Sequence, residues 1–122
     1  MKLVEWFKDK FKHAPANRVV EVTCRDDAVE LSWPQSPNET VLLNDIQRIV
    51  IRNTDQGPFD EDVFFCLETD EDTFVIPQGA DGVSELLERL QQFPGFNNEA
   101  LIESMGCTDN RLFVCWERVP TT

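Results

Sequence analysis

Residues 41–77 read VLLNDIQRIVIRNTDQGPFDEDVFFCLETDEDTFVIP. Apolar residues in this stretch recur at nearly every second position, which is typical of β-strands rather than helices. Turn-forming residues and clusters of carboxylates separate the apolar runs. The pattern predicts strands near 46–54, 62–69 and 73–77. Because the connections between them are short, we expect neighbouring strands to pair antiparallel.

The same alternation extends toward the N-terminus and returns near the C-terminus. RVVEVTC, AVELSWP and ETVLLND predict strands near 18–24, 28–33 and 39–43, and RLFVCWERV predicts a last strand at 111–118. We expect largely buried side chains at the inward positions of these strands and of the helix that follows residue 81. They are Ile49, Ile51, Phe65, Leu67, Phe74, Ile76, Leu87, Leu90 and Trp116.

Helical spacing of apolar residues appears in three places. DGVSELLERLQQFPGF predicts a helix near 82–92 that Asp81 caps, and EALIESM predicts a shorter helix near 98–105 that ends at Gly106. At the N-terminus, MKLVEWFKDKFKHAPAN predicts an amphipathic helix near 2–13 that Pro15 ends. Its apolar side chains fall within an arc of roughly 160° at 100° per residue. They are Leu3, Val4, Trp6, Phe7 and Phe11.

Three docking sites remain open for the N-terminal helix. A helix this short gains most of its stability from tertiary packing, which favours the protein's own sheet. A groove on a partner protein is the second alternative. The lysines that flank the apolar face also fit a membrane surface, which makes this helix the one candidate for membrane contact.

The chain length fits one domain, with an N-terminal helix in residues 1–17, antiparallel strands in 18–77, and helices plus the final strand in 78–122. The predicted fold class is α+β, mostly antiparallel sheet, with an N-terminal amphipathic helix and two C-terminal helices before a last strand.

Residues 19–93 resemble the bacterial pleckstrin-homology-like domains. The resemblance rests on VLLNDIQRIVI, on DVFFCLETDEDTFVIP with its isoleucine–proline end, and on the helix GVSELLERL. It implies a bent sandwich or partial barrel that the helix plugs at one open end. The plugging face would consist of Val83, Leu86, Leu87 and Leu90. The segment from Phe93 onward, FPGFNNEALIESMGCTDNRLFVCWERV, departs from that pattern.

Charge is divided unevenly along the chain. Residues 1–18 sum to +3, whereas the whole chain carries −12, so residues 19–122 carry −15. An acidic body of this kind repels nucleic acid and anionic membranes. The loops at 34–38, 55–62 and 69–72 are acidic or neutral, which also opposes phosphoinositide binding. We therefore expect a protein partner, and a basic one if the charge takes part.

No catalytic, cofactor or metal motif is recognisable. The chain has a single histidine, His13, no phosphate-binding glycine pattern, and four cysteines without C-x-x-C spacing. Cys66 and Cys115 lie in apolar strands, where we expect buried free thiols. We expect no cofactor and no metal. The lack of a long apolar run or a secretory signal predicts a cytoplasmic protein.

Two acidic clusters, at residues 60–62 and 70–72, lie at opposite ends of the strand predicted at 62–69. At about 3.3 Å per residue they are over ~20 Å apart, too far for joint carboxylate catalysis. Neither matches a calcium-binding loop. Each cluster is either a solvated turn or a binding surface. We expect the aromatic corner near Pro94 to pack into the core, and a ligand-stacking role is its alternative. The candidate partner-binding residues are Asp60, Glu61, Asp62, Asp70, Glu71, Asp72 and Phe96.

These features predict a non-catalytic cytosolic protein-interaction module with an acidic surface. An immunity-type inhibitor that neutralises a basic toxin such as a nuclease is the alternative, since charge complementarity speeds association. An enzyme of unrecognised type is the third interpretation.

Overall fold

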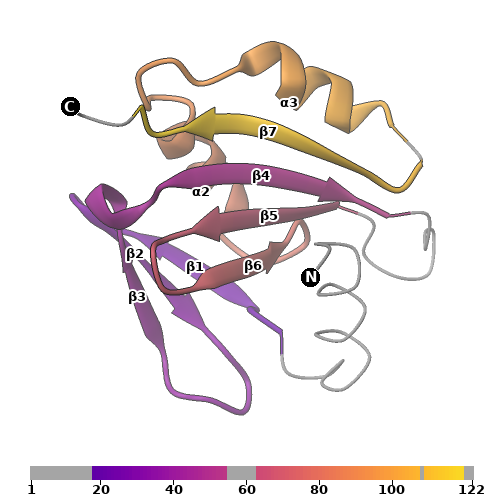
Figure 1. The fold of residues 1–122 in the computed structure, drawn as a ribbon. Helices are drawn as coiled ribbons and strands as arrows, with labels where there is room; N and C mark the ends of the chain where they lie inside the picture. Colours follow the sequence, from indigo (N-terminus) through magenta and orange to yellow (C-terminus); the bar gives the residue numbers. More distant parts are fainter. Residues whose placement is uncertain (1–17, 55–62, 108, 120–122) are drawn as a thin grey trace.

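The computed structural model describes residues 18–54, 63–107 and 109–119. These residues form two antiparallel sheets and two α-helices (Figure 1). Sheet 1 has the order β1-β2-β3, and sheet 2 has the order β6-β5-β4-β7. The strands are β1 (Glu21–Cys24), β2 (Ala28–Ser32), β3 (Glu39–Leu42), β4 (Arg48–Asn53), β5 (Val63–Glu68), β6 (Thr73–Pro77) and β7 (Arg111–Glu117). The helices are α2 (Val83–Leu90), α3 (Asn98–Met105) and the short 3-10 helix η1 (Leu43–Asp45).

The fold class that we expected is wrong. The described residues are mostly sheet and form two separate antiparallel sheets of three and four strands with two α-helices, where we expected all neighbouring strands to pair. The sheets separate because η1 turns the chain between β3 and β4, and these two strands do not pair. The C-terminal strand β7 then pairs with β4 and extends sheet 2 on that side. The helix predicted near 2–13 lies outside the described residues.

Each predicted strand range contains an observed strand, with bounds that differ by up to three residues. The agreement follows from the alternating pattern, which assigns side chains to the two faces of a strand. The expected antiparallel pairing of neighbouring strands is confirmed for β1–β2, β2–β3, β4–β5 and β5–β6. Alternation does not say where one sheet ends, and β3 and β4 do not pair.

The main core fills the space between the two sheets. One face of each sheet contributes to it, together with the apolar sides of α2 and α3. The side chains predicted to be buried are confirmed as buried, except Phe74 and Leu87, which are partly buried against the same core. On α2, Val83, Leu86 and Leu90 are buried.

The start of α2 differs from the prediction that Asp81 caps the helix. The N-cap residue is Gly82, with φ at +87°, and no side chain caps it. The backbone of Asp81 bonds instead to the chain at β1, since its N–H donates to the Val20 carbonyl at 3.0 Å and its carbonyl accepts from the Val22 N–H at 2.7 Å. These bonds fix α2 against sheet 1.

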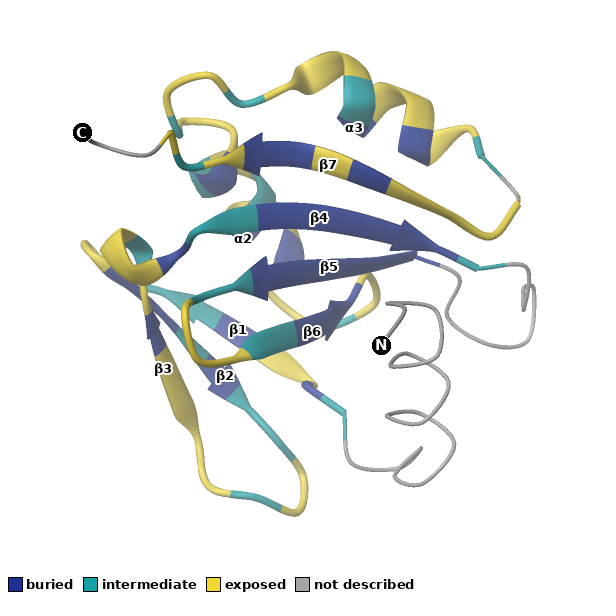
Figure 2. Ribbon diagram, viewed as in Figure 1, coloured by how far each residue is buried: buried dark blue, intermediate teal, exposed yellow. Residues whose placement is uncertain are grey.

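The two central strands of sheet 2, β4 and β5, are buried on both faces. Nearly every residue of β4 and β5 is buried, so both strands are dark blue over most of their length in Figure 2. Successive side chains of a strand point to opposite faces, so burial at successive positions requires cover on both sides. One face belongs to the main core. The other face carries a second apolar cluster, here called the outer cluster, which consists of Val50, Phe64, Cys66 and Val75.

Candidate functional site

Of the two predicted acidic clusters, the structure describes the one in the turn between β5 and β6. Asp70, Glu71 and Asp72 are all exposed. The Thr69 N–H donates to the Asp72 carbonyl at 2.8 Å, and the Thr69 hydroxyl accepts from the Asp72 N–H at 3.1 Å. These bonds hold the turn, while its three carboxylates make no ion pair with any residue in the described ranges. The other cluster, at 60–62, lies outside those ranges.

An ion pair anchors the base of this turn. The Arg48 Nε and Nη2 atoms each donate to one oxygen of Glu68 at 3.0 Å, which ties the start of β4 to the end of β5. The hydrogen bond from the guanidinium to Glu68 raises the pKa of Arg48. Such bidentate pairs fix orientation as well as charge, so the acidic turn projects from a rigid strand end.

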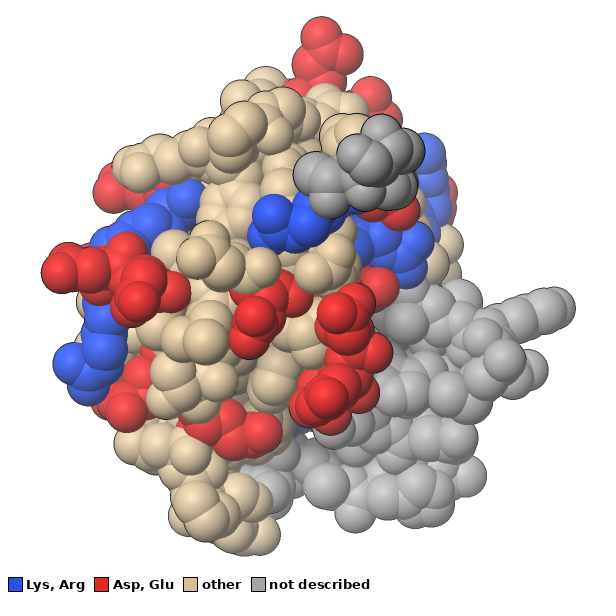
Figure 3. All heavy atoms as spheres, turned by 60° about the vertical axis from the view of Figure 1, so that its left-hand side comes forward, with Lys and Arg blue, Asp and Glu red and all other residues tan. Residues whose placement is uncertain are grey.

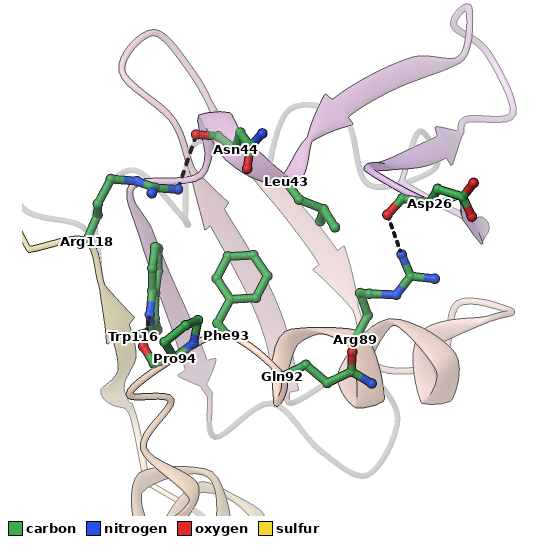
Figure 4. Close-up of a pocket in the computed structure, with 9 residues that line it drawn as sticks. All are labelled: Asp26, Leu43, Asn44, Arg89, Gln92, Phe93, Pro94, Trp116 and Arg118. Carbon is green, nitrogen blue, oxygen red and sulfur yellow. Dashed lines mark hydrogen bonds between the residues drawn. The ribbon is translucent and has the colours of Figure 1, made fainter.

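A hollow of about 350 Å³ opens at the same end of sheet 2. It lies between the end of α2, η1, the β1–β2 turn and the end of β7 (Figure 4). The residues that line it are Asp26, Leu43, Asn44, Arg89, Gln92, Phe93, Pro94, Trp116 and Arg118.

Two aromatic rings form an apolar wall of the hollow. Phe93 meets Trp116 edge to face, with ring centroids 4.8 Å apart and an interplanar angle of 82°. The Trp116 indole Nε1–H donates to the Pro94 carbonyl at 2.8 Å. The hydrogen bond and the ring contact together fix the position of Trp116.

Two arginines lie on opposite sides of the hollow (Figure 4). Arg118 donates to the Ile46 carbonyl from Nε at 3.1 Å and from Nη2 at 2.8 Å, and its guanidinium stands 5.0 Å from the Trp116 ring centroid. Arg89 donates from Nη1 to the carbonyls of Arg25 and Asp26. Backbone carbonyls hold both guanidinium groups, and within the described residues neither forms an ion pair. Both positive charges are therefore held in fixed positions, and no carboxylate among the described residues pairs with them.

Most of the lining residues are uncharged or are arginines. Asp26 is the one carboxylate among them, and none is a histidine, cysteine or serine. Across the described part of the chain, no group of three His, Cys, Asp or Glu side chains is placed to hold a metal ion. No helix in that part is long and apolar enough to cross a membrane.

Charges of both signs gather on the face that includes this end of sheet 2. Figure 3 turns the side of Figure 1 that carries the β5–β6 turn and η1 forward, and it shows several groups of acidic side chains with basic side chains between them. The acidic chain thus carries local positive charge beside its carboxylates.

Phe96 does not line the hollow. It is partly buried and packs against the main core, and its N–H donates to the Phe93 carbonyl at 3.0 Å. The corner at Pro94 therefore contributes to the site through Phe93, not through Phe96.

Sequence reasoning missed Arg89 and Arg118 as site residues and treated Trp116 as core alone. One signal was available, because all six basic residues after Arg18 are arginines and the four lysines lie before it. Arginine is favoured over lysine where a cation must bind in a fixed geometry at an interface. Which of the six arginines meet at one place depends on the sheet pairing, which the pattern does not give.

Comparison of the chain with protein-family models, with curated proteins and with solved structures finds no match. The resemblance to pleckstrin-homology-like domains thus finds no support outside the sequence pattern, and no residue role is transferred from a relative.

Proposed function

We propose that the chain is a protein-binding module whose partner docks at one end of sheet 2. This partner-binding end consists of the acidic turn at residues 70–72 and the hollow beside it. The observation that carries the proposal is the pair of guanidinium groups held by backbone carbonyls next to the fixed Phe93–Trp116 pair. Tryptophan and arginine are the residue types that most often anchor protein interfaces.

The two parts of this end would act at different stages of binding. The exposed carboxylates of the turn, in a chain of net charge −12, attract a basic partner and speed its association. Once the partner is bound, a side chain that enters the hollow contacts the Phe93 and Trp116 rings and the fixed guanidinium groups of Arg89 and Arg118. An anionic or polar side chain fits those donors, so the partner would present a mixed surface, basic around a polar or acidic projection.

The cysteines support a cytoplasmic location for this activity. All four are free thiols in the structure, and Cys66 and Cys115 are buried. Unpaired cysteines are the usual state in reducing compartments.

Affinity capture from lysate of the source cell tests the proposal. The native chain is compared at low and high salt with a variant in which the turn is neutralised, Asp70→Asn/Glu71→Gln/Asp72→Asn. We expect the variant to retain less of the captured protein at low salt, with the difference shrinking as salt rises, because screening weakens exposed charge attraction. The association rate should account for most of the loss.

A variant with the same change in net charge provides the control. Glu99→Gln/Glu103→Gln/Asp109→Asn removes three exposed acids on α3 and in the loop after it. Equal losses from the two variants would contradict a local site and indicate attraction by net charge alone. Replacement of Arg118 by glutamine then tests the hollow, where we expect faster dissociation at every salt concentration. A captured basic toxin would identify the chain as an inhibitor of that toxin.

A further inference from the structure

The outer cluster on sheet 2 is covered, although the described elements around that sheet pack on its other face. Its four side chains are between 0% and 4% exposed. Sheet 1, α2 and α3 contribute their apolar side chains to the main core. Within the described ranges, the outer cluster contains residues of β4, β5 and β6 alone. Another part of the chain must therefore exclude water from this face.

The covered area has a definite extent. Strand pairing places Val50, Cys66 and Val75 in one row, which Val114 continues on β7. Val75 is 4% exposed, whereas Val114 is 45% exposed. The cover therefore spans β4 to β6 and stops before β7. Three adjacent strands measure roughly 10 Å between the outer two, and one helix with its side chains is about as wide.

The chain that precedes residue 18 emerges beside this area. The backbone of Val20 and Val22 bonds to Asp81, which follows the last residue of β6, Pro77, by four positions. Since β6 is the strand at that edge of sheet 2, residues before 18 start close to the covered area. Four residues of linker, 14–17, reach at most about 13 Å, which is enough to place a helix over three strands.

We propose that residues 1–17 dock on the outer cluster of sheet 2 through the apolar arc of their amphipathic pattern. The arc supplies five large apolar side chains, whereas residues 55–62 supply one, Phe59. Docking here removes Trp6, Phe7 and Phe11 from water together with the centre of the sheet face. The same docking makes this face unavailable to a membrane or to a partner, and leaves the partner-binding end open.

Thiol labelling of the full chain tests the proposal, with each cysteine followed separately by mass spectrometry. Cys66 lies in the outer cluster and Cys115 in the main core, so they report on the two faces of one sheet. We expect Phe7→Ser/Phe11→Ser to speed Cys66 labelling at least about tenfold by local opening, and Cys115 labelling less than about twofold. The matched variant Lys8→Gln/Lys12→Gln changes the opposite side of the same segment and should leave both rates unchanged.

Several results would overturn the proposal. One is unchanged protection of Cys66 in Phe7→Ser/Phe11→Ser. Another is a rise in Cys66 labelling with Phe59→Ser alone, which would make residues 55–62 the cover. A third is faster labelling of the native chain on dilution, which would make a second copy the cover. If both thiols of the double variant react together because it unfolds, nuclear Overhauser contacts in the native chain decide. Contacts from the Phe7 and Phe11 rings to the Val50 and Val75 methyl groups support docking, and their absence refutes it.

Discussion

Gly82 is the residue whose identity the fold constrains most directly. Its φ of +87° is disfavoured for any side chain, and a Cβ at this position would lie 2.1 Å from the Val22 carbonyl oxygen. That oxygen belongs to a backbone held to Asp81 by a hydrogen bond from the Val22 N–H. The contact cannot be relieved by rotation of a side chain. Close approach of α2 to β1 therefore requires glycine.

We expect Gly82→Ala to lower the free energy of unfolding by about 2–4 kcal/mol, measured by urea denaturation. Gly95→Ala is the matched control, because Gly95 has a similar φ of +84° with no atom within 4 Å of the added Cβ. It should lower the free energy by about 1 kcal/mol, from backbone strain alone. Similar losses at the two glycines would refute the close contact at Val22.

The buried thiols make the free energy of unfolding depend on pH in the alkaline range. Burial raises the pKa of Cys66 and raises that of Cys115 to about 11. An unfolded chain loses these protons near its ordinary thiol pKa, whereas the folded chain keeps them. The stabilisation is complete below about pH 8 and is lost as pH rises from there toward the folded-state values. The chain has no tyrosine, so no phenol titrates in this range.

We expect the free energy of unfolding, measured with a reducing agent present, to fall between about pH 9 and 11. The slope for each thiol should be at most about 1.4 kcal/mol per pH unit. Cys115→Ala should reduce that slope, whatever its effect on stability at pH 7. A native chain whose stability is constant from pH 8 to 11 would refute the raised pKa values.

At the level of elements, the buried side-chain amide of Asn53 joins the end of α3 to β4 of sheet 2. The Asn53 Nδ2 atom donates to the Ser104 carbonyl at 2.6 Å and to the Cys107 carbonyl at 3.0 Å. These carbonyls lie at the C-terminal end of α3, where a helix lacks backbone partners. Asn53 is fully buried at the end of β4. The contact positions α3 against β4, although 51 residues separate Asn53 from Ser104.

We expect Asn53→Ala to lower the free energy of unfolding by about 1–3 kcal/mol, because the Ser104 carbonyl loses its shorter hydrogen bond and the part-buried Cys107 carbonyl loses its amide donor. Asn98→Ala, at the exposed start of α3, should change it by no more than about 0.5 kcal/mol. Amide hydrogen exchange should accelerate in α3 before it does in β5. Uniform acceleration across the domain would show that Asn53 acts on global stability alone.

The spacing of apolar residues along the chain was enough to locate the strands and helices, but not to predict how they pack together. Alternation located every strand, and the apolar spacing of EALIESM located α3, whose start the Asn97 side chain caps by accepting from the Ala100 N–H at 3.0 Å. Sheet order depends instead on contacts between distant residues, such as the pairing of β4 with β7. Asp81 has the chemistry of a cap, yet pairing with β1 uses its backbone and places Gly82 at that position. Tertiary contacts decided both cases.

For the whole molecule, the proposed site includes two arginines although the chain as a whole is strongly acidic. With a net charge of −12, the sequence pointed to two carboxylate clusters and to Phe96 as candidate partner-binding residues. The fold brings Arg89 and Arg118, which are 29 positions apart, to the same hollow. It also places the turn at 70–72 at the end of the sheet where this hollow opens. The acidic residues of the proposed site could be picked out from the sequence, whereas the two arginines could be grouped only from the three-dimensional structure.

Hydrogen–deuterium exchange of the full chain, with and without the captured partner, tests the central claim most directly. We expect the partner to slow exchange in the turn at 69–72, at the end of α2 in 89–93 and at the end of β7 in 116–118, because these segments form the proposed partner-binding end. Residues 1–17 and α3 should exchange as in the free chain. Protection confined to those two regions, with none at the turn or around the hollow, would contradict the account.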